Sequence, residues 1–191
     1  MTTRLCLVLG GVRSGKSAFA ESKAVEFNQA ADQTALYVAT GVAFDGEMKD
    51  RILRHKESRP QEWPTLEEPV KLAEKISSFL QKADSTGVVI IDSIDVWVAN
   101  LLMGHQTDDS QTQETIVIGE VDKLLNLMGE ASQAFVLVSS EVGLSLVPPE
   151  PLGRRFQDFL GTVNQRIATA AIEVYLIVAG IPLKIKSANT E

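Results

Sequence analysis

The sequence predicts a three-layer α/β domain whose sheet is mostly parallel and ends in one antiparallel edge strand at the C-terminal side. Short apolar runs bounded by turn residues alternate along the chain with stretches of helical period, a pattern typical of a parallel sheet covered by helices. No stretch rich in Pro, Gly or Ser divides the 191 residues. We therefore expect a single domain over residues 1–191.

The first half of the chain supplies two strand-helix units and the start of a third. Residues 5–9 are apolar and read as a buried strand, and residues 18–27 have helical period. A second strand is expected at 35–39, and Asp45 can cap a helix at 46–57 that the Arg-Pro pair at 59–60 ends. The further expected elements here are an amphipathic helix at 70–81, a long strand at 88–91 and a helix at 94–103.

The second half continues the alternation after a polar stretch at residues 108–110. We expect a helix at 113–128, a strand at 134–138, a long helix at 152–171 and a last central strand at 174–178. The Ala-Gly pair at 179–180 then turns the chain into an antiparallel edge strand at 182–186. Lysines alternate along that strand and are expected to discourage further pairing at the edge.

Composition and charge exclude several classes of protein. A formal net charge of −7 argues against a broad nucleic-acid surface, and no apolar run approaches the length of a membrane span. The N-terminus enters the first strand directly, so we expect no cleavable signal and a cytoplasmic location. The one cysteine, Cys6, excludes an internal disulfide and a cysteine-based metal cluster. A local basic group suits a phosphorylated small molecule or a solvated helix face: Arg51, Arg54, Lys56 and Arg59.

Residues 10–17, Gly-Gly-Val-Arg-Ser-Gly-Lys-Ser, match the pattern G-x-x-x-x-G-K-[ST] directly after the first strand. In such a loop the glycines let successive N–H groups point at phosphate oxygens, and the following helix adds its positive N-terminal end. Lys16 would reach the β- and γ-phosphates. Outside this context the pattern would describe only a glycine-rich turn with a solvated lysine. The motif predicts a P-loop NTPase-like (RecA-like) domain that binds a nucleoside triphosphate through Gly10, Gly11, Val12, Arg13, Ser14, Gly15, Lys16 and Ser17.

Asp92 ends the apolar run at residues 87–92, which brings an acid to the carboxyl edge of the predicted sheet. In P-loop proteins an acid in this place binds or orients Mg²⁺ beside the serine of the loop. Asp92 and Ser17 are therefore the candidate Mg²⁺ ligands. The alternative is that Asp92 only begins the next helix, a role that we also expect for Asp95.

His55 is an unusual candidate because the chain has only two histidines. Met48, Ile52 and His55 are spaced i, i+4 and i+7, so they share the buried face of the expected helix at 46–57. An imidazole can attack the α-phosphorus of a nucleotide and form a phosphoramidate, which splits a nucleotidyl transfer into two steps. On periodicity alone, a half-buried structural histidine is the commoner interpretation. The other histidine, His105, is expected at the surface.

Further polar residues lie where a ligand is expected or on the face of a helix. Glu67 and Glu68 could accept from a ribose or a base, although a solvated turn is the commoner explanation. Glu141 follows the strand at 134–138 on the carboxyl edge, where open α/β sheets place ligands. Asn164 and Arg166 on the long helix could meet a substrate or fix the helix to its surroundings.

Taken together, these residues resemble the adenosylcobinamide kinase/adenosylcobinamide-phosphate guanylyltransferase family, the bifunctional enzymes of cobalamin nucleotide-loop assembly. The resemblance covers nearly the whole chain and includes the P-loop and Asp92. Its other marks are the segments at 37–40 (Tyr-Val-Ala-Thr), 51–56 (Arg-Ile-Leu-Arg-His-Lys), 59–60 (Arg-Pro), 97–102 (Trp-Val-Ala-Asn-Leu-Leu), 140–143 (Ser-Glu-Val-Gly), 147–148 (Val-Pro), 153–156 (Gly-Arg-Arg-Phe), 163–166 (Val-Asn-Gln-Arg) and 179–183 (Ala-Gly-Ile-Pro-Leu).

The resemblance implies phosphorylation of the aminopropanol hydroxyl of adenosylcobinamide by ATP or GTP, followed by transfer of GMP from GTP to that phosphate. Pyrophosphate is released in the second reaction. Lys16 and His55 are then the catalytic residues, His55 carries the guanylyl group, and the protein forms a homotrimer. The residues that complete the GTP and Mg²⁺ site are Thr40, Gly41, Val42, Glu57, Ser58, Arg59, Pro60, Glu67 and Asp92.

The chain departs from the family pattern at Ser140, where members often have Asn, and at Ile172, where an acid is common. Neither is a nucleotide residue. Two other functions remain open: a monofunctional small-molecule kinase in which His55 is structural, and a nucleotide-binding regulatory module without covalent chemistry. Against a GTPase switch, the chain has no Asn-Lys-x-Asp guanine motif.

Overall fold

The computed structural model describes residues 4–28, 33–42, 60, 62–83 and 85–187. Its strands are β1 (Leu5–Gly10), β2 (Thr34–Ala39), β3 (Thr65–Glu67), β4 (Thr86–Asp92), β5 (Ala134–Ser140), β6 (Glu173–Val178) and β7 (Ile181–Lys186). Its helices are α1 (Lys16–Phe27), α3 (Leu72–Leu80), α4 (Ile94–Gly104), α5 (Ser110–Glu130) and α6 (Pro151–Ala170). The helix expected at 46–57 lies outside the described residues.

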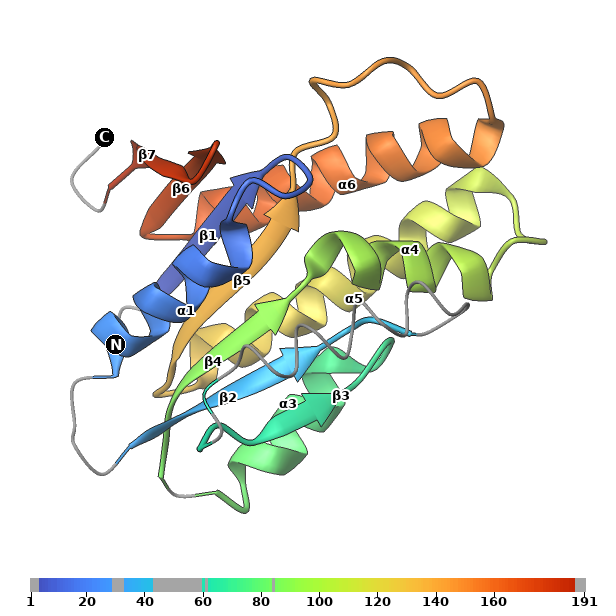
Figure 1. The fold of residues 1–191 in the computed structure, drawn as a ribbon. Helices are drawn as coiled ribbons and strands as arrows, with labels where there is room; N and C mark the ends of the chain where they lie inside the picture. Colours follow the sequence, from blue (N-terminus) through green and yellow to red (C-terminus); the bar gives the residue numbers. More distant parts are fainter. Residues whose placement is uncertain (1–3, 29–32, 43–59, 61, 84, 188–191) are drawn as a thin grey trace.

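The described strands form one seven-stranded sheet in the order β3-β2-β4-β5-β1-β6-β7. All neighbours from β3 to β6 pair in parallel, and only β6 and β7 pair antiparallel. The predicted parallel sheet with an antiparallel C-terminal edge is therefore confirmed (Figure 1). Because β1 to β6 run the same way, their carboxyl ends meet at one edge of the sheet, which is where α/β folds place ligands.

Alternation along each strand divides the core between the two faces of the sheet. Cys6 and Val8 of β1 pack with Ala20 and Ala24 of α1 on one face of the sheet. Leu7, which lies between them on β1, belongs to the core on the other face, with the remaining helices. Of the described helices, Figure 1 shows α1 in front of the sheet, with α3, α5 and α6 behind it. The two small alanines let α1 lie close to the sheet, and the three layers follow from this division.

Two expectations about the strands were incomplete or wrong. The short strand β3 was not expected, because three residues between prolines carry too little periodicity; it pairs in parallel with β2. The strand at 174–178 is β6, which is next to the edge and not central. Only one strand, β7, lies beyond β6 in the sheet, and Val178 at the end of β6 is 57% exposed.

An ion cluster around the buried Lys23 joins the β6–β7 hairpin to α1. Lys23 is 5% exposed and contacts Glu173 at 2.8 Å and Glu26 at 2.9 Å, and Lys184 contacts Glu173 at 2.6 Å. Burial alone would raise the pKa of Glu173, but hydrogen bonds from Lys184 and Lys23 hold it below its usual range. Lys184 therefore forms an ion pair, in addition to the expected role of its charge in discouraging further pairing at the edge strand.

Burial raises the pKa of the nearby Cys6 thiol to about 12, although the charge of Lys23 acts in the opposite direction. The thiol is fully buried in β1 and therefore stays protonated at neutral pH. Cys6 is thus a core residue, as the sequence indicated.

Candidate functional site

Several of the predicted site residues meet at the carboxyl edge of the sheet. Strand register places Glu67 beside Ala39 and Ala39 beside Asp92, so these three form one row across β3, β2 and β4. Gly10, where the P-loop begins, lies beside Ser140 at the end of β5, and β5 separates β1 from β4. Asp92 is level with Val138 of β5 and Val8 of β1, so it lies two strands away from the strand that leads into the P-loop.

The P-loop backbone is held from both sides. Within the loop, the Ser14 N–H donates to the Gly11 carbonyl at 3.3 Å. On one side the N–H of Glu141 donates to the Gly10 carbonyl at 3.2 Å, and on the other the N–H of Gly180 donates to the Ser14 carbonyl at 2.8 Å. Backbone hydrogen bonds from the segments after β5 and β6 therefore hold the loop in place.

The start of α1 has the properties of an anion site. Gly15, with φ of 97°, stands at the N-cap, no side chain caps the helix, and its first turn has no acid. The first backbone N–H groups of such a helix need acceptors from outside it. The half-buried Lys16 donates from Nζ to the Gly11 carbonyl at 2.8 Å, and Ser17 is the next residue of the turn. The hydroxyl of Ser14 is buried without a hydrogen-bond partner among the described residues.

Replacement of Gly10 by alanine is expected to destabilise the fold. An added Cβ would lie 2.6 Å from the Ile177 carbonyl oxygen and 2.7 Å from the Ser14 hydroxyl. We expect Gly10→Ala to lose about 1–3 kcal/mol of unfolding free energy, as overpacked sites do. Gly11→Ala is the matched control, since nothing lies within 4 Å of its Cβ, and should change stability by less than about 0.5 kcal/mol. Equal denaturant midpoints for the two variants would contradict this packing.

Asp92 is half-buried and fixed in orientation by Tyr37, whose phenol O–H donates to Asp92 Oδ2 at 2.5 Å. Together with the Ser17 hydroxyl it offers the hard oxygen ligands that Mg²⁺ prefers. Among the described residues no group of three or more His, Cys, Asp and Glu side chains could hold a metal.

Thr40 is fully buried, and its side chain forms hydrogen bonds within the protein. Its hydroxyl donates to the Ser93 carbonyl and accepts from the Ser93 N–H, both at 2.8 Å. Its own carbonyl accepts from Asn100 Nδ2 at 2.8 Å. Thr40 therefore fastens the end of β2 to the end of β4, and it leaves Gly41 exposed and Val42 half-buried at the edge.

The two acids after Trp63 and Pro64 have different places. Glu67 is exposed at the end of β3, in the row that includes Asp92. Glu68 is half-buried, and its Oε1 accepts from the N–H groups of Val70 and Lys71 at 2.9 and 2.8 Å in the segment just before α3. Pro60 is half-buried, and the remaining predicted residues lie outside the described part of the chain: His55, Glu57, Ser58 and Arg59.

The structure also assigns roles to residues whose function the sequence left open. Asn164 fixes α6 to β5, because Ser139 Oγ donates to its Oδ1 at 2.7 Å and its Nδ2 donates to the Ser140 carbonyl at 3.1 Å. Arg166 pairs with Asp122 of α5 at 2.7 Å. These contacts favour the structural alternative for both residues.

Three functional positions were missed or given too small a role by sequence reasoning. Tyr37 orients Asp92, Asn100 holds the segment after β2, and Asp95, expected only at a helix start, accepts from Ser140 Oγ at 2.9 Å. All three interactions join segments distant in sequence. The only signal in the sequence was that each residue interrupts or directly follows an apolar run at a strand end or on a helix.

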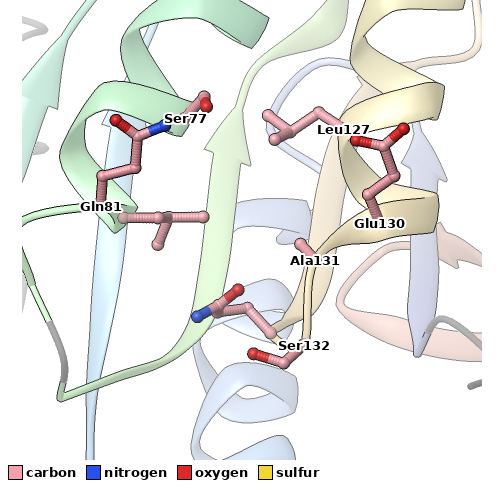
Figure 2. A pocket seen from close by; sticks show the side chains of 8 residues that line it. Ser77, Gln81, Leu127, Glu130, Ala131 and Ser132 are labelled. Atoms are coloured by element: carbon pink, nitrogen blue, oxygen red, sulfur yellow. The ribbon is translucent and has the colours of Figure 1, made fainter.

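A hollow of about 300 Å³ lies away from this site (Figure 2). It lies between the C-terminal ends of α3 and α5, at the amino edge of the sheet. Its lining residues are Ser77, Leu80, Gln81, Leu127, Glu130, Ala131, Ser132 and Gln133. None of them is near the P-loop, so the hollow is not part of the candidate site. None of the described helices combines the length and the apolar composition that a bilayer span requires.

Comparisons with known proteins place the chain in a family. A model of the family described as cobinamide kinase / cobinamide phosphate guanyltransferase matches residues 6–185. The chain is 41% identical over 180 residues to the bifunctional adenosylcobalamin biosynthesis protein CobP of Pseudomonas aeruginosa, which covers 94% of this chain and 96% of that protein. It is 37% identical over 188 residues to the bifunctional adenosylcobalamin biosynthesis protein CobU of Escherichia coli, with 95% and 99% covered.

Among solved structures, the chain is similar to the flagellar accessory protein FlaH of Methanocaldococcus jannaschii. The TM-score is 0.54 at 16% identity, over 97% of this chain and 79% of that one. A likeness at this identity concerns the fold alone and agrees with the P-loop NTPase-like, RecA-like architecture.

Proposed function

Because the chain belongs to the cobinamide kinase/cobinamide phosphate guanyltransferase family, we propose that both of its reactions use the phosphate cradle of residues 10–17 and that His55 carries GMP in the second. The chain is a bifunctional cobinamide kinase and cobinamide phosphate guanylyltransferase of adenosylcobalamin biosynthesis. Its substrates are accordingly nucleoside triphosphates and a corrinoid. The observation that carries the proposal is the P-loop at the uncapped start of α1, with Lys16 folded over it.

In the kinase reaction, the oxygen of the corrinoid hydroxyl forms a bond to the γ-phosphorus of ATP or GTP. The bond between that phosphorus and the bridging oxygen breaks, the nucleoside diphosphate leaves, and the hydroxyl proton is released. Charge accumulates on the transferred phosphoryl group and on the leaving oxygen. Lys16 and the N–H groups at the start of α1 are fixed donors that stabilise this charge.

In the guanylyltransferase reaction, a ring nitrogen of His55 attacks the α-phosphorus of GTP, and pyrophosphate leaves. A phosphate oxygen of cobinamide phosphate then attacks the same phosphorus, and the bond from phosphorus to nitrogen breaks. The histidine is thereby regenerated, which divides one difficult displacement into two easier ones. The cradle that binds the β- and γ-phosphates before the first step stabilises the pyrophosphate that leaves.

Ser17 and Asp92 are the residues that we propose to hold Mg²⁺, with Tyr37 keeping the Asp92 carboxylate in place. When bound, Mg²⁺ neutralises phosphate charge and thereby assists both displacements. We further propose that Thr40, Gly41, Val42, Pro60 and Glu67 contribute to the nucleotide site together with Glu57, Ser58 and Arg59. The hydrogen bonds between the Thr40 hydroxyl and the Ser93 backbone support a positioning role for Thr40 within that site. A cytoplasmic location remains our expectation for an enzyme that consumes ATP and GTP.

Incubation with α-labelled GTP and Mg²⁺, without corrinoid, separates this proposal from its alternatives. A histidine that carries GMP predicts label bound covalently to the protein through an acid-labile, alkali-stable bond. A monofunctional kinase or a regulatory module predicts only reversible binding. Absence of any adduct on protein with active kinase turnover would exclude the covalent step.

We propose that the enzyme is a homotrimer and that the apolar hairpin face, defined by Val178, Ile181, Leu183 and Ile185, lies between subunits. These side chains are 57%, 70%, 56% and 54% exposed in the single chain. An exposed apolar surface of this kind marks an interaction site.

Light scattering is expected to give three times the 20.8 kDa mass of the chain. Leu183→Asp should shift the protein to the monomer mass, because an unpaired charge would be buried in the contact. Val25→Asp on α1, where Val25 is 62% exposed, should leave the mass unchanged. A trimer that tolerates Leu183→Asp would place the subunit contact elsewhere.

A further inference from the structure

We propose that the loop at residues 142–149 is the surface on which the corrin ring of the acceptor substrate docks, with Leu144, Leu146 and Val147 as its contact residues. The inference deepens the two-reaction function given above and rests on it. It concerns the ring of the substrate, whereas the P-loop serves only the phosphate end.

The side chains of this loop are unusually exposed for apolar residues. Leu144 is 86% exposed, Leu146 is 94% exposed and Val147 is 73% exposed. Residues 142–149 contain no charged side chain, in a chain whose net charge is −7. Clustered apolar side chains that are exposed to water and do not pack in the protein core mark a surface that a ligand or a partner covers.

The loop is held in shape, so its exposure is not a consequence of loose packing. The Val142 carbonyl accepts from Ser145 N–H at 3.2 Å, from Ser145 Oγ at 2.6 Å and from Gln157 Nε2 at 2.7 Å. At the far end, Arg154 Nη1 donates to the Pro148 carbonyl at 3.1 Å. A loop fixed in this way presents its apolar side chains with little further loss of conformational entropy on binding.

The loop adjoins the phosphate cradle. It begins at the end of β5, and the N–H of Glu141 donates to the carbonyl of Gly10, the first residue of the P-loop. Figure 1 shows the loop between β5 and α6 leaving the same edge of the sheet as the loop between β1 and α1. Val12 in the P-loop is itself 77% exposed. The apolar loop therefore begins next to the polar cradle, at the same edge of the sheet.

A corrinoid has the matching chemistry. Its macrocycle is broad and carries methyl groups, and the hydroxyl that becomes phosphorylated lies at the end of a flexible arm. When that hydroxyl, or later its phosphate, is at the cradle, the ring has to rest on the surface beside the P-loop. Apolar side chains in a fixed loop contact such a ring without having to displace tightly bound water from charged groups.

The test uses the enzyme with Leu144→Ser and Leu146→Ser, measured separately. We expect each variant to raise the KM for cobinamide in the kinase reaction about tenfold, and the KM for cobinamide phosphate by a similar factor, because a leucine contact is lost from the bound state. The kcat at saturating corrinoid, the KM for the nucleotide and the yield of GMP adduct with GTP alone should not change. Val25→Ser, at another exposed apolar position, on α1, is the matched control and should leave every constant unchanged.

Two results would overturn the inference. Unchanged corrinoid KM values in both loop variants would show that the ring docks elsewhere. A fall in molecular mass of the variants would make the loop a contact between copies of the chain. Failure of the wild-type protein to form a GMP adduct would contradict the proposed covalent step, but the kinase KM values would still test the loop.

Discussion

Protein with His55→Ala is expected to form no acid-labile GMP adduct and to lose guanylyl transfer by about 10³-fold or more, since removal of a covalent nucleophile is among the largest single effects in catalysis. The adduct is measured with α-labelled GTP and Mg²⁺ after denaturing electrophoresis, with acid and alkali treatment of parallel samples. Cobinamide kinase turnover should persist, because phosphoryl transfer to a hydroxyl does not pass through the imidazole.

The matched control is His105→Ala, at the other histidine of the chain. His105 pairs with Asp108 at 2.9 Å in the segment between α4 and α5, and its side chain is 42% exposed. This variant should form the adduct at the wild-type rate. An adduct that survives in His55→Ala and disappears in His105→Ala would mean that the nucleophile has been assigned to the wrong residue.

Lys16→Ala should lose both activities, each by about 10² to 10³-fold, the cost typical of removing one charge-stabilising donor from a transition state. The two losses occur together because one cradle binds the γ-phosphoryl group in the first reaction and the leaving pyrophosphate in the second. Initial rates of cobinamide phosphorylation and of adduct formation check the prediction at saturating nucleotide.

Lys82→Ala, at an exposed lysine in the turn after α3, is the control for loss of a positive charge and should be silent in both assays. Full kinase turnover in Lys16→Ala would show that the phosphate site does not lie at the P-loop. Loss of only one activity would mean that the two reactions do not share the cradle.

The sequence predicted most of the fold because the information lay in local patterns. The apolar run before the P-loop, the helix after it and the carboxylate at the end of β4 were each recognisable within a few residues, and strand polarity then placed them at one edge. Strand β3 was missed because it exists only through its pairing with β2. The placement of β6 was wrong because periodicity reports how buried a strand is and carries no information on its neighbours.

The candidate site was less predictable than the fold, since its fine positioning depends on contacts across the chain. Thr40 was correctly placed at the end of a strand, but its hydroxyl forms both of its hydrogen bonds with the backbone of Ser93. Tyr37 gave no sign that it would bond to Asp92, since a tyrosine in a strand usually indicates packing alone. No local pattern could have predicted that Asn100 would reach the carbonyl of Thr40.

The hydrogen bond from the Gly180 N–H to the Ser14 carbonyl has a consequence for the order of events during synthesis. The P-loop is synthesised before residues 134–180, but β1 lies between β5 and β6, and the turn after β6 closes on Ser14. Residues up to Gly180 must therefore emerge from the ribosome before the loop has all of these contacts. A nascent chain that already carries the complete P-loop motif still lacks the strands on both sides of β1, so the support of the loop is completed late in synthesis.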